Sequence, residues 1–258
     1  MPAERGSQHL PYFEPALPRV IAHRGLAIEA PENSLLAFAH ALAVGAAHLE
    51  TDVHASADGV AVVAHDADLS RVAGRPQRVG DLTAADLARL DLGQSQHMPT
   101  LAEALSAFPE ARFNIDLKSA NAVDAAVAAI RAARAEDRVL LTSFSERRRR
   151  AALAQLPGVA TSASGPRFAA ALLASVLRGG PLVKAALRGL HAVQIPTRAI
   201  GLDTVSPARI RAFHAAGVEV HVWTINDETE MRRLLSLGVD GIVTDRADVA
   251  VEVVGGLG

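Results

Sequence analysis

The chain has 258 residues, of which half are hydrophobic and 21% are charged, so it can bury a sizeable core and has the composition of a soluble globular protein. Its formal net charge of −2 gives no overall positive field, which argues against nucleic acid as the main partner. It contains no cysteine, which excludes disulfides and thiolate metal sites.

No segment has the pattern of a membrane or export signal. The first 18 residues are interrupted by prolines and charges and lack the apolar core of a signal peptide. The apolar stretch 168–193 is broken by basic residues, glycines and a proline, so we expect no transmembrane segment. These observations predict a cytoplasmic location.

From residue 19 onward, short apolar or β-branched runs alternate with alanine-rich stretches. The eight runs are 19–22, 48–53, 112–117, 138–142, 159–163, 192–196, 218–224 and 240–244. This alternation predicts repeated βα units and a parallel sheet. Eight strands in a chain of this length favour a closed (β/α)8 TIM barrel, an α/β fold, in one domain spanning residues 1–258.

Helix start and stop signals agree with this order. Asn33 or Ser34 can cap a helix that Gly45 ends, and Thr100 with Glu103 forms a capping-box pattern. Further helices are predicted after Asn121, from Ser206 to Gly217 and from Asp227 to Gly238.

The connection between the second and third barrel strands is longer than one crossover helix requires. Within it, the sequence ADGVAVVAHDADL predicts a hairpin with Asp58–Gly59 as its turn, and His65 follows the hairpin strand. We expect residues 55–99 to form a small inserted subdomain over the barrel mouth.

Acidic side chains are predicted to converge at the carboxyl ends of the strands, where barrel enzymes place their sites. Glu50 and Asp52 are two apart in the second strand and share one face, and Asp116 has the same parity in the third. Three carboxylates facing one lumen repel one another unless a cation neutralises them. The pattern therefore predicts one divalent metal ion, Mg²⁺, Ca²⁺ or Mn²⁺.

Two histidines lie beside this predicted cluster. His23 ends the first strand and is followed by Arg24, which is suited to forked contacts with phosphate oxygens. His65 lies in the inserted segment, so the pair could face each other across the mouth and act as acid and base.

The ordered motifs resemble the glycerophosphodiester phosphodiesterase family. The matching segments are AHRG (22–25), APENSLLAF (30–38), LETDVHASADGVAVVAHDADLSR (49–71), PTLAEAL (99–105), NIDLK (114–118), VHVWTIND (220–227) and GVDGIVTD (238–245). They occur in family order over nearly the whole chain after residue 18.

The resemblance implies roles for individual residues. It makes His23 and His65 the catalytic pair and Glu50 and Asp52 the paired metal ligands. Other positions that match the family are the basic residues near the phosphate, Arg24 and Lys118, the acid of the PEN motif, Glu32, and the aromatic at the end of the seventh strand, Trp223. This chain departs from the family pattern at Ser34, where threonine is more usual, and at Asp116, where glutamate is commoner.

The implied reaction is hydrolysis of a small-molecule glycerophosphodiester to glycerol phosphate and an alcohol. One histidine would activate the nucleophile and the other would protonate the leaving alkoxide. The residues leave open which histidine does which, and whether water or a substrate hydroxyl attacks. They also leave open the head group, the metal's identity and the oligomeric state.

Alternative interpretations rest on other segments. A lipid-directed phosphodiesterase, similar to sphingomyelinase D or phospholipase C, could use residues 168–190 as a basic amphipathic surface at membranes. A non-catalytic phosphodiester-binding barrel would be expected to have lost the histidines or acids, which are intact. The run Arg147–Arg150 reads as a solvated helix face. Four further polar residues are interpreted as structural: His191, Gln194, His214 and His221.

Overall fold

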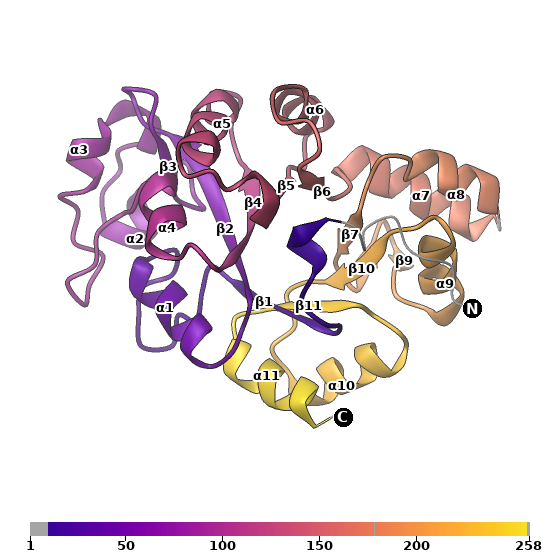
Figure 1. Ribbon diagram of the computed structural model, residues 1–258. Coiled ribbons are helices and arrows are strands. Elements are labelled where there is room, and N and C mark those ends of the chain that lie inside the picture. Colours follow the sequence, from indigo (N-terminus) through magenta and orange to yellow (C-terminus); the bar gives the residue numbers. More distant parts are fainter. Residues whose placement is uncertain (1–9, 178, 257–258) are drawn as a thin grey trace.

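Eight parallel strands form a nearly closed barrel in the computed structural model, which describes residues 10–177 and 179–256 (Figure 1). They are β1 (Arg19–His23), β2 (His48–Ala55), β4 (Arg112–Leu117), β5 (Val139–Thr142), β6 (Ala160–Thr161), β7 (Ala192–Ile195), β10 (Glu219–Val222) and β11 (Gly241–Thr244). The sheet order is β6-β5-β4-β2-β1-β11-β10-β7, and a bridge between Ser162 and Ala192 joins its two ends. The predicted TIM barrel is confirmed.

Each of the eight predicted runs contains a barrel strand, but the fifth is much shorter than expected. The run 159–163 predicted five strand residues, whereas β6 has only two. Ser162 continues the pairing by one bridge before the chain turns into the next helix. The short strand leaves β6 and β7 joined by very few backbone contacts.

Helices surround the barrel (Figure 1). They are α1 (Leu35–Ala43), α4 (Leu101–Ala107), α5 (Ala122–Ala132), α6 (Glu146–Gln155), α7 (Gly165–Val176), α8 (Gly180–Ala186), α9 (Pro207–Ala215), α10 (Glu228–Ser236) and α11 (Ala247–Gly255), with η4 (Glu136–Arg138) before β5. Ser34, not Asn33, caps α1, because its side chain accepts from the Ala37 amide. The capping box of Thr100 and Glu103 is present. In the described ranges, no helix has both the length and the apolar character that crossing a bilayer requires.

The arginine run at the start of α6 is only partly solvated. Arg147 and Arg150 are exposed, as expected. The expectation is wrong for Arg149, which is 4% exposed and donates two hydrogen bonds to Glu146. A paired arginine can be buried because the carboxylate replaces the water it loses.

The segment between β2 and β4 has elements and an apolar cluster of its own. β3 (Ala61–Val63) pairs antiparallel with β2, and α2 (Ser70–Ala73), η3 (Val79–Asp81) and α3 (Ala84–Leu87) follow. The Ser56 amide donates to Val60 O around Asp58–Gly59, as the hairpin prediction requires. The members of the apolar cluster are Val62, Ala64, Leu69, Val79, Leu87, Leu90 and Met98.

The amino end of the barrel is filled by buried polar groups. Arg19 of β1 donates two hydrogen bonds to Glu219 of β10, at 2.7 and 2.8 Å, and both residues are buried. Tyr12 of the single-turn helix η2 (Pro11–Phe13) is fully buried and contacts the ring of His48 edge-on. A side chain on Gly241 would come within 2.9 Å of the His221 ring, so glycine is required there. Among the described residues, these side chains occupy the amino end of the barrel, and the large cavity lies at the carboxyl end.

Candidate active site

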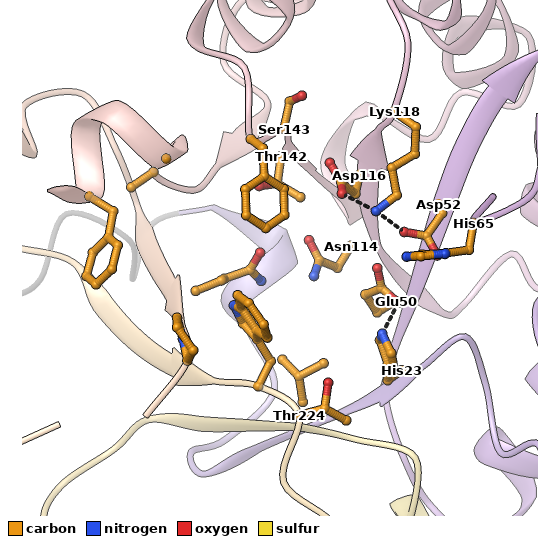
Figure 2. Close-up of a pocket in the computed structure, with 18 of the residues that line it drawn as sticks. His23, Glu50, Asp52, His65, Asn114, Asp116, Lys118, Thr142, Ser143 and Thr224 are labelled. Carbon is orange, nitrogen blue, oxygen red and sulfur yellow. Dashed lines mark ion pairs between the residues drawn. The ribbon is translucent and has the colours of Figure 1, made fainter. Parts of the chain in front are cut away.

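The carboxyl end of the barrel holds a cavity of about 400 Å³ (Figure 2). Eight of the nine residues expected in the site line it: His23, Arg24, Glu50, Asp52, His65, Asp116, Lys118 and Trp223. The ninth, Glu32, lies outside the cavity and bonds to Arg24. Glu50, Asp52 and Asp116 thus share the lumen face that strand parity predicted for them.

The three predicted carboxylates come from adjacent strands with matching register. Asp52 is opposite Asp116 in the β2–β4 pairing, and Glu50 is two residues nearer the barrel floor, opposite Asn114. Burial and the charge of Asp52 raise the pKa of Glu50 to about 8. Burial also raises the pKa of Asp116. Both shifts have the direction expected for acids that lack sufficient positive charge nearby.

Lys118 partly neutralises this cluster. Its Nζ lies 2.8 Å from Asp52 Oδ1 and 2.7 Å from Asp116 Oδ2 (Figure 2). Asp116 Oδ1 is buried and has no hydrogen-bond partner in the described part of the chain. Within residues 10–177 and 179–256, no three histidine or acidic side chains already surround one point closely enough to hold a metal ion.

His23 is held between Glu50 and the carboxylate of Asp245, which directly follows β11. Its Nδ1 lies 2.7 Å from Asp245 Oδ1, and its Nε2 lies 3.9 Å from Glu50 Oε2. Burial disfavours the charged imidazole, but the hydrogen bond to Asp245 and the charge of Glu50 together raise the pKa of His23. Asn226 donates to the second oxygen of Asp245 and so fixes that carboxylate.

His65 has a matching partner within the inserted segment. Its Nδ1 lies 2.8 Å from Asp66 Oδ1. In both histidines, therefore, Nδ1 is the nitrogen hydrogen-bonded to an aspartate. Arg71 donates to the other oxygen of Asp66 at 2.6 Å. The ring of His54 helps to hold the loop, since its Nε2 lies 3.2 Å from the carbonyl oxygen of His65.

A chain of ion pairs joins the inserted segment to the barrel. Arg71 makes two hydrogen bonds to Glu32, and Glu32 accepts another from Arg24. Burial opposes ionisation of Glu32, but these hydrogen bonds hold its pKa below the ordinary value. Arg24 Nε lies 3.2 Å from Asp52 Oδ2 as an ion pair, although the angle is not that of a hydrogen bond.

The local backbone explains why Arg24 and Asn33 reach these positions. Arg24 has a positive φ of 57°, and its amide donates to the carbonyl and to a carboxylate oxygen of Glu50. Gly25 follows with its Cα so close to α1 that an added Cβ would lie 2.6 Å from the Ala37 carbonyl carbon. Asn33 donates to Asp52 instead of capping α1. The PENS segment thus orients Asp52.

Comparison with known proteins places this geometry in a family. Residues 23–249 match the model of the glycerophosphoryl diester phosphodiesterase family. The chain belongs to this family. It is therefore a phosphoric diester hydrolase, as the sequence resemblance predicted.

Individual relatives support the same assignment. The probable glycerophosphodiester phosphodiesterase 2 of Mycobacterium tuberculosis is 43% identical over 235 residues, which cover 90% of this chain and 89% of the relative. A phosphodiesterase structure from Oleispira antarctica, in complex with the product sn-glycerol-3-phosphate, is 27% identical, with a TM-score of 0.76 and coverage of 93% and 97%. A glycerophosphodiester phosphodiesterase structure from Agrobacterium tumefaciens is also 27% identical, with a TM-score of 0.75 and coverage of 92% and 99%.

The part of this phosphodiesterase's cavity around Trp223 is largely apolar. Trp223 and Phe144 form an edge-to-face pair with ring centroids 6.3 Å apart. The other apolar side chains of this part are Ala163, Phe168, Pro196 and Ala199. The cavity therefore offers charge in one part and hydrophobic surface in another.

The sequence analysis did not select several residues that contact the predicted site. Asp245 directly follows β11 and could have been found by reading the residue after every strand. Asp66 directly follows His65, so reading the residues after the hairpin strand could have found it in the same way. Arg71 could not have been found in this way, because its exposed side chain reaches Glu32, 39 residues away in sequence.

Proposed function

We propose that this phosphodiesterase hydrolyses glycerophosphodiesters in a metal-dependent reaction with His23 and His65 as acid and base. The observation that carries the proposal is the paired arrangement of these histidines. Each has its Nδ1 beside a carboxylate, Asp245 or Asp66, and both rings line the cavity that contains the acidic cluster.

The donor set fits a hard divalent ion. Glu50, Asp52 and Asp116 offer only oxygen ligands, which Mg²⁺, Mn²⁺ and Ca²⁺ prefer. The buried and unpartnered Asp116 Oδ1 and the raised pKa of Glu50 both indicate a missing positive charge. When bound, such an ion supplies charge that stabilises the negative oxygens of the phosphodiester.

The chain's own residues then supply proton transfer and orientation. A histidine whose Nδ1–H is donated to a carboxylate presents Nε2 as a base, or as an acid once protonated. Arg24 and Lys118 are placed to attract the phosphate, and Glu32 orients Arg24. Trp223 offers an apolar wall to the organic part of the substrate.

We further propose that residues 55–99 act as an inserted subdomain that brings His65 to the mouth of one catalytic domain. The separate apolar cluster and the ion-pair chain through Arg71 and Glu32 support this role. Binding of a small diester requires only that this segment hold His65 near the cavity.

Metal removal tests the proposal. Exhaustive chelation should abolish hydrolysis of glycerophosphocholine, and Mg²⁺ or Mn²⁺ should restore it at least as well as Ca²⁺, because the shorter Asp116 suits a small ion. Asp116→Asn should lower the affinity of the protein for the metal ion. Asp86→Asn, at a half-exposed surface position, is the matched control. Full activity after chelation would refute metal dependence.

A lipid-directed activity remains a second candidate because of the composition of one segment. Residues 147–202 contain eight arginines and one lysine but no aspartate or glutamate. Exposed large hydrophobic side chains also concentrate in this segment, at Leu173, Val176, Leu177, Leu182 and Ile200. A rise in kcat/KM on anionic vesicles over soluble glycerophosphodiesters would favour this candidate, whereas we expect soluble diesters to be the better substrates.

A further inference from the structure

Two carboxamides in the cavity have no place in the proposed acid, base and metal chemistry. Asn114 lies on β4 between the parity-matched Asp116 and the barrel floor, and Gln194 lies on β7. Both line the cavity. Asn114 is shown near Glu50 in Figure 2.

Asn114 is nearly fully buried, with 2% of its surface exposed, yet its Oδ1 has no hydrogen-bond partner among the described residues. A buried carboxamide oxygen without a partner costs free energy of the order of a lost hydrogen bond. A ligand hydroxyl in the cavity could remove this cost, with rotation of the carboxamide if needed.

Gln194 is held in one orientation by a buried relay. His221 Nε2 lies 3.0 Å from Glu219 Oε2, and Glu219 also accepts from Arg19, so the carboxylate receives the Nε2–H of the imidazole. His221 Nδ1 lies 3.5 Å from Gln194 Nε2, and in the tautomer that donates Nε2–H to Glu219 it accepts from this amide.

The other end of the Gln194 carboxamide is also fixed. Ser162 Oγ lies 3.2 Å from Gln194 Oε1 and 2.7 Å from Thr142 Oγ1. An amide nitrogen carries two protons, so one remains after the contact with His221. Gln194 is half-buried at the cavity and can present that proton to a ligand.

We propose that Asn114 and Gln194 form a subsite that binds the glycerol hydroxyls of the substrate. A hydroxyl needs both a donor and an acceptor when it leaves water, and the two carboxamides supply both. The apolar wall around Trp223 offers no such pairing and suits the other ester group. This inference rests on the proposed function, and it makes the glycerol half the part of the diester that is recognised by hydrogen bonds.

Calorimetric binding of two phosphate monoesters tests the subsite without requiring turnover. The unmodified protein, supplied with Mg²⁺, should bind sn-glycerol 3-phosphate at least ~10-fold more tightly than ethyl phosphate, which lacks both hydroxyls. Gln194→Leu should reduce this preference to within about threefold. Gln155→Leu, on the outer face of α6, is the matched control and should retain the preference.

Ser162→Ala provides a milder variant if Gln194→Leu fails to fold. It removes the contact to Gln194 Oε1 with little change in volume, and it should reduce the preference part of the way. Equal affinity of the unmodified protein for the two monoesters would overturn the subsite, as would an unchanged preference in folded Gln194→Leu. Absence of diester hydrolysis with a normal preference would instead count against the proposed function alone.

Discussion

Two carboxylates, Asp66 and Asp245, determine how the histidines present their rings. Each lies within 2.8 Å of a histidine Nδ1 and should hold the tautomer in which Nε2 faces the substrate. An amide in place of the carboxylate can stabilise the other tautomer and cannot offset imidazolium charge.

We therefore predict that Asp245→Asn and Asp66→Asn each lower kcat by ~10²-fold or more with a smaller change in KM. Burial lowers the pKa of His23 and the hydrogen bond to Asp245 raises it, so in Asp245→Asn the limb of the pH profile that depends on His23 should move to lower pH. A purely structural role would not cause this shift. Asp68→Asn, at a half-buried neighbour that accepts from the Ser70 amide, serves as the control. Unchanged profiles in both variants would remove the carboxylates from the mechanism.

At the scale of elements, one arginine of α2 joins the inserted segment to the rest of the site. Arg71 bonds to Asp66 and to Glu32, so it links the loop of His65 to the PENS segment. Both partners are only partly buried, so loss of the link should have little effect on global stability.

Arg71→Met is expected to lower kcat ~10-fold while changing the free energy of unfolding by less than ~1 kcal/mol, because His65 and Arg24 lose a shared support. Steady-state kinetics and urea unfolding give the two values. Arg75→Met is the comparison variant in the same segment. Equal kinetics for the two variants would show that the chain of ion pairs has no role in catalysis.

The elements were largely predictable, because strand parity, caps and the long second connection each leave local signals. The short β6 was not, since the run VATSA has strand-like residues whether or not a neighbour pairs with them. Contacts across the barrel were equally unpredictable from local sequence, because the partners are far apart along the chain: His23 and Asp245 are separated by 222 residues. Asn33 and Ser34 were both candidates for the cap of α1, and sequence could not separate them: Ser34 is the cap, while the Asn33 amide bonds to Asp52.

At the scale of the whole molecule, a buried ion pair between β1 and β10 joins the two ends of the chain. Burial opposes the charge of Glu219, but hydrogen bonds from Arg19 and His221 lower its pKa to about 2. A depressed acid pKa in the folded state stabilises the fold above the unfolded value of about 4.5, and this contribution is lost as pH falls from there towards 2.

Arg19→Met should destabilise the protein by about 3–5 kcal/mol at pH 7, because Glu219 is left buried without its partner. The double variant Arg19→Met/Glu219→Leu should recover part of that loss. Urea unfolding at pH 7, 4 and 3 should also show a weaker acid dependence in Glu219→Gln than in the unmodified protein. If Arg19→Met is as stable as the unmodified protein, the ion pair does not stabilise the amino end of the barrel.

Two-histidine hydrolysis of glycerophosphodiesters is the activity proposed for this family member. The most direct measurement is ³¹P NMR of glycerophosphocholine hydrolysis with Mg²⁺, for the unmodified protein and for His23→Ala and His65→Ala. The unmodified protein should convert the diester to glycerol phosphate, and each folded variant should be slower by ~10²-fold or more. Near-normal turnover in both variants would contradict the two-histidine mechanism, and no turnover by the unmodified protein under any metal would contradict the proposed reaction.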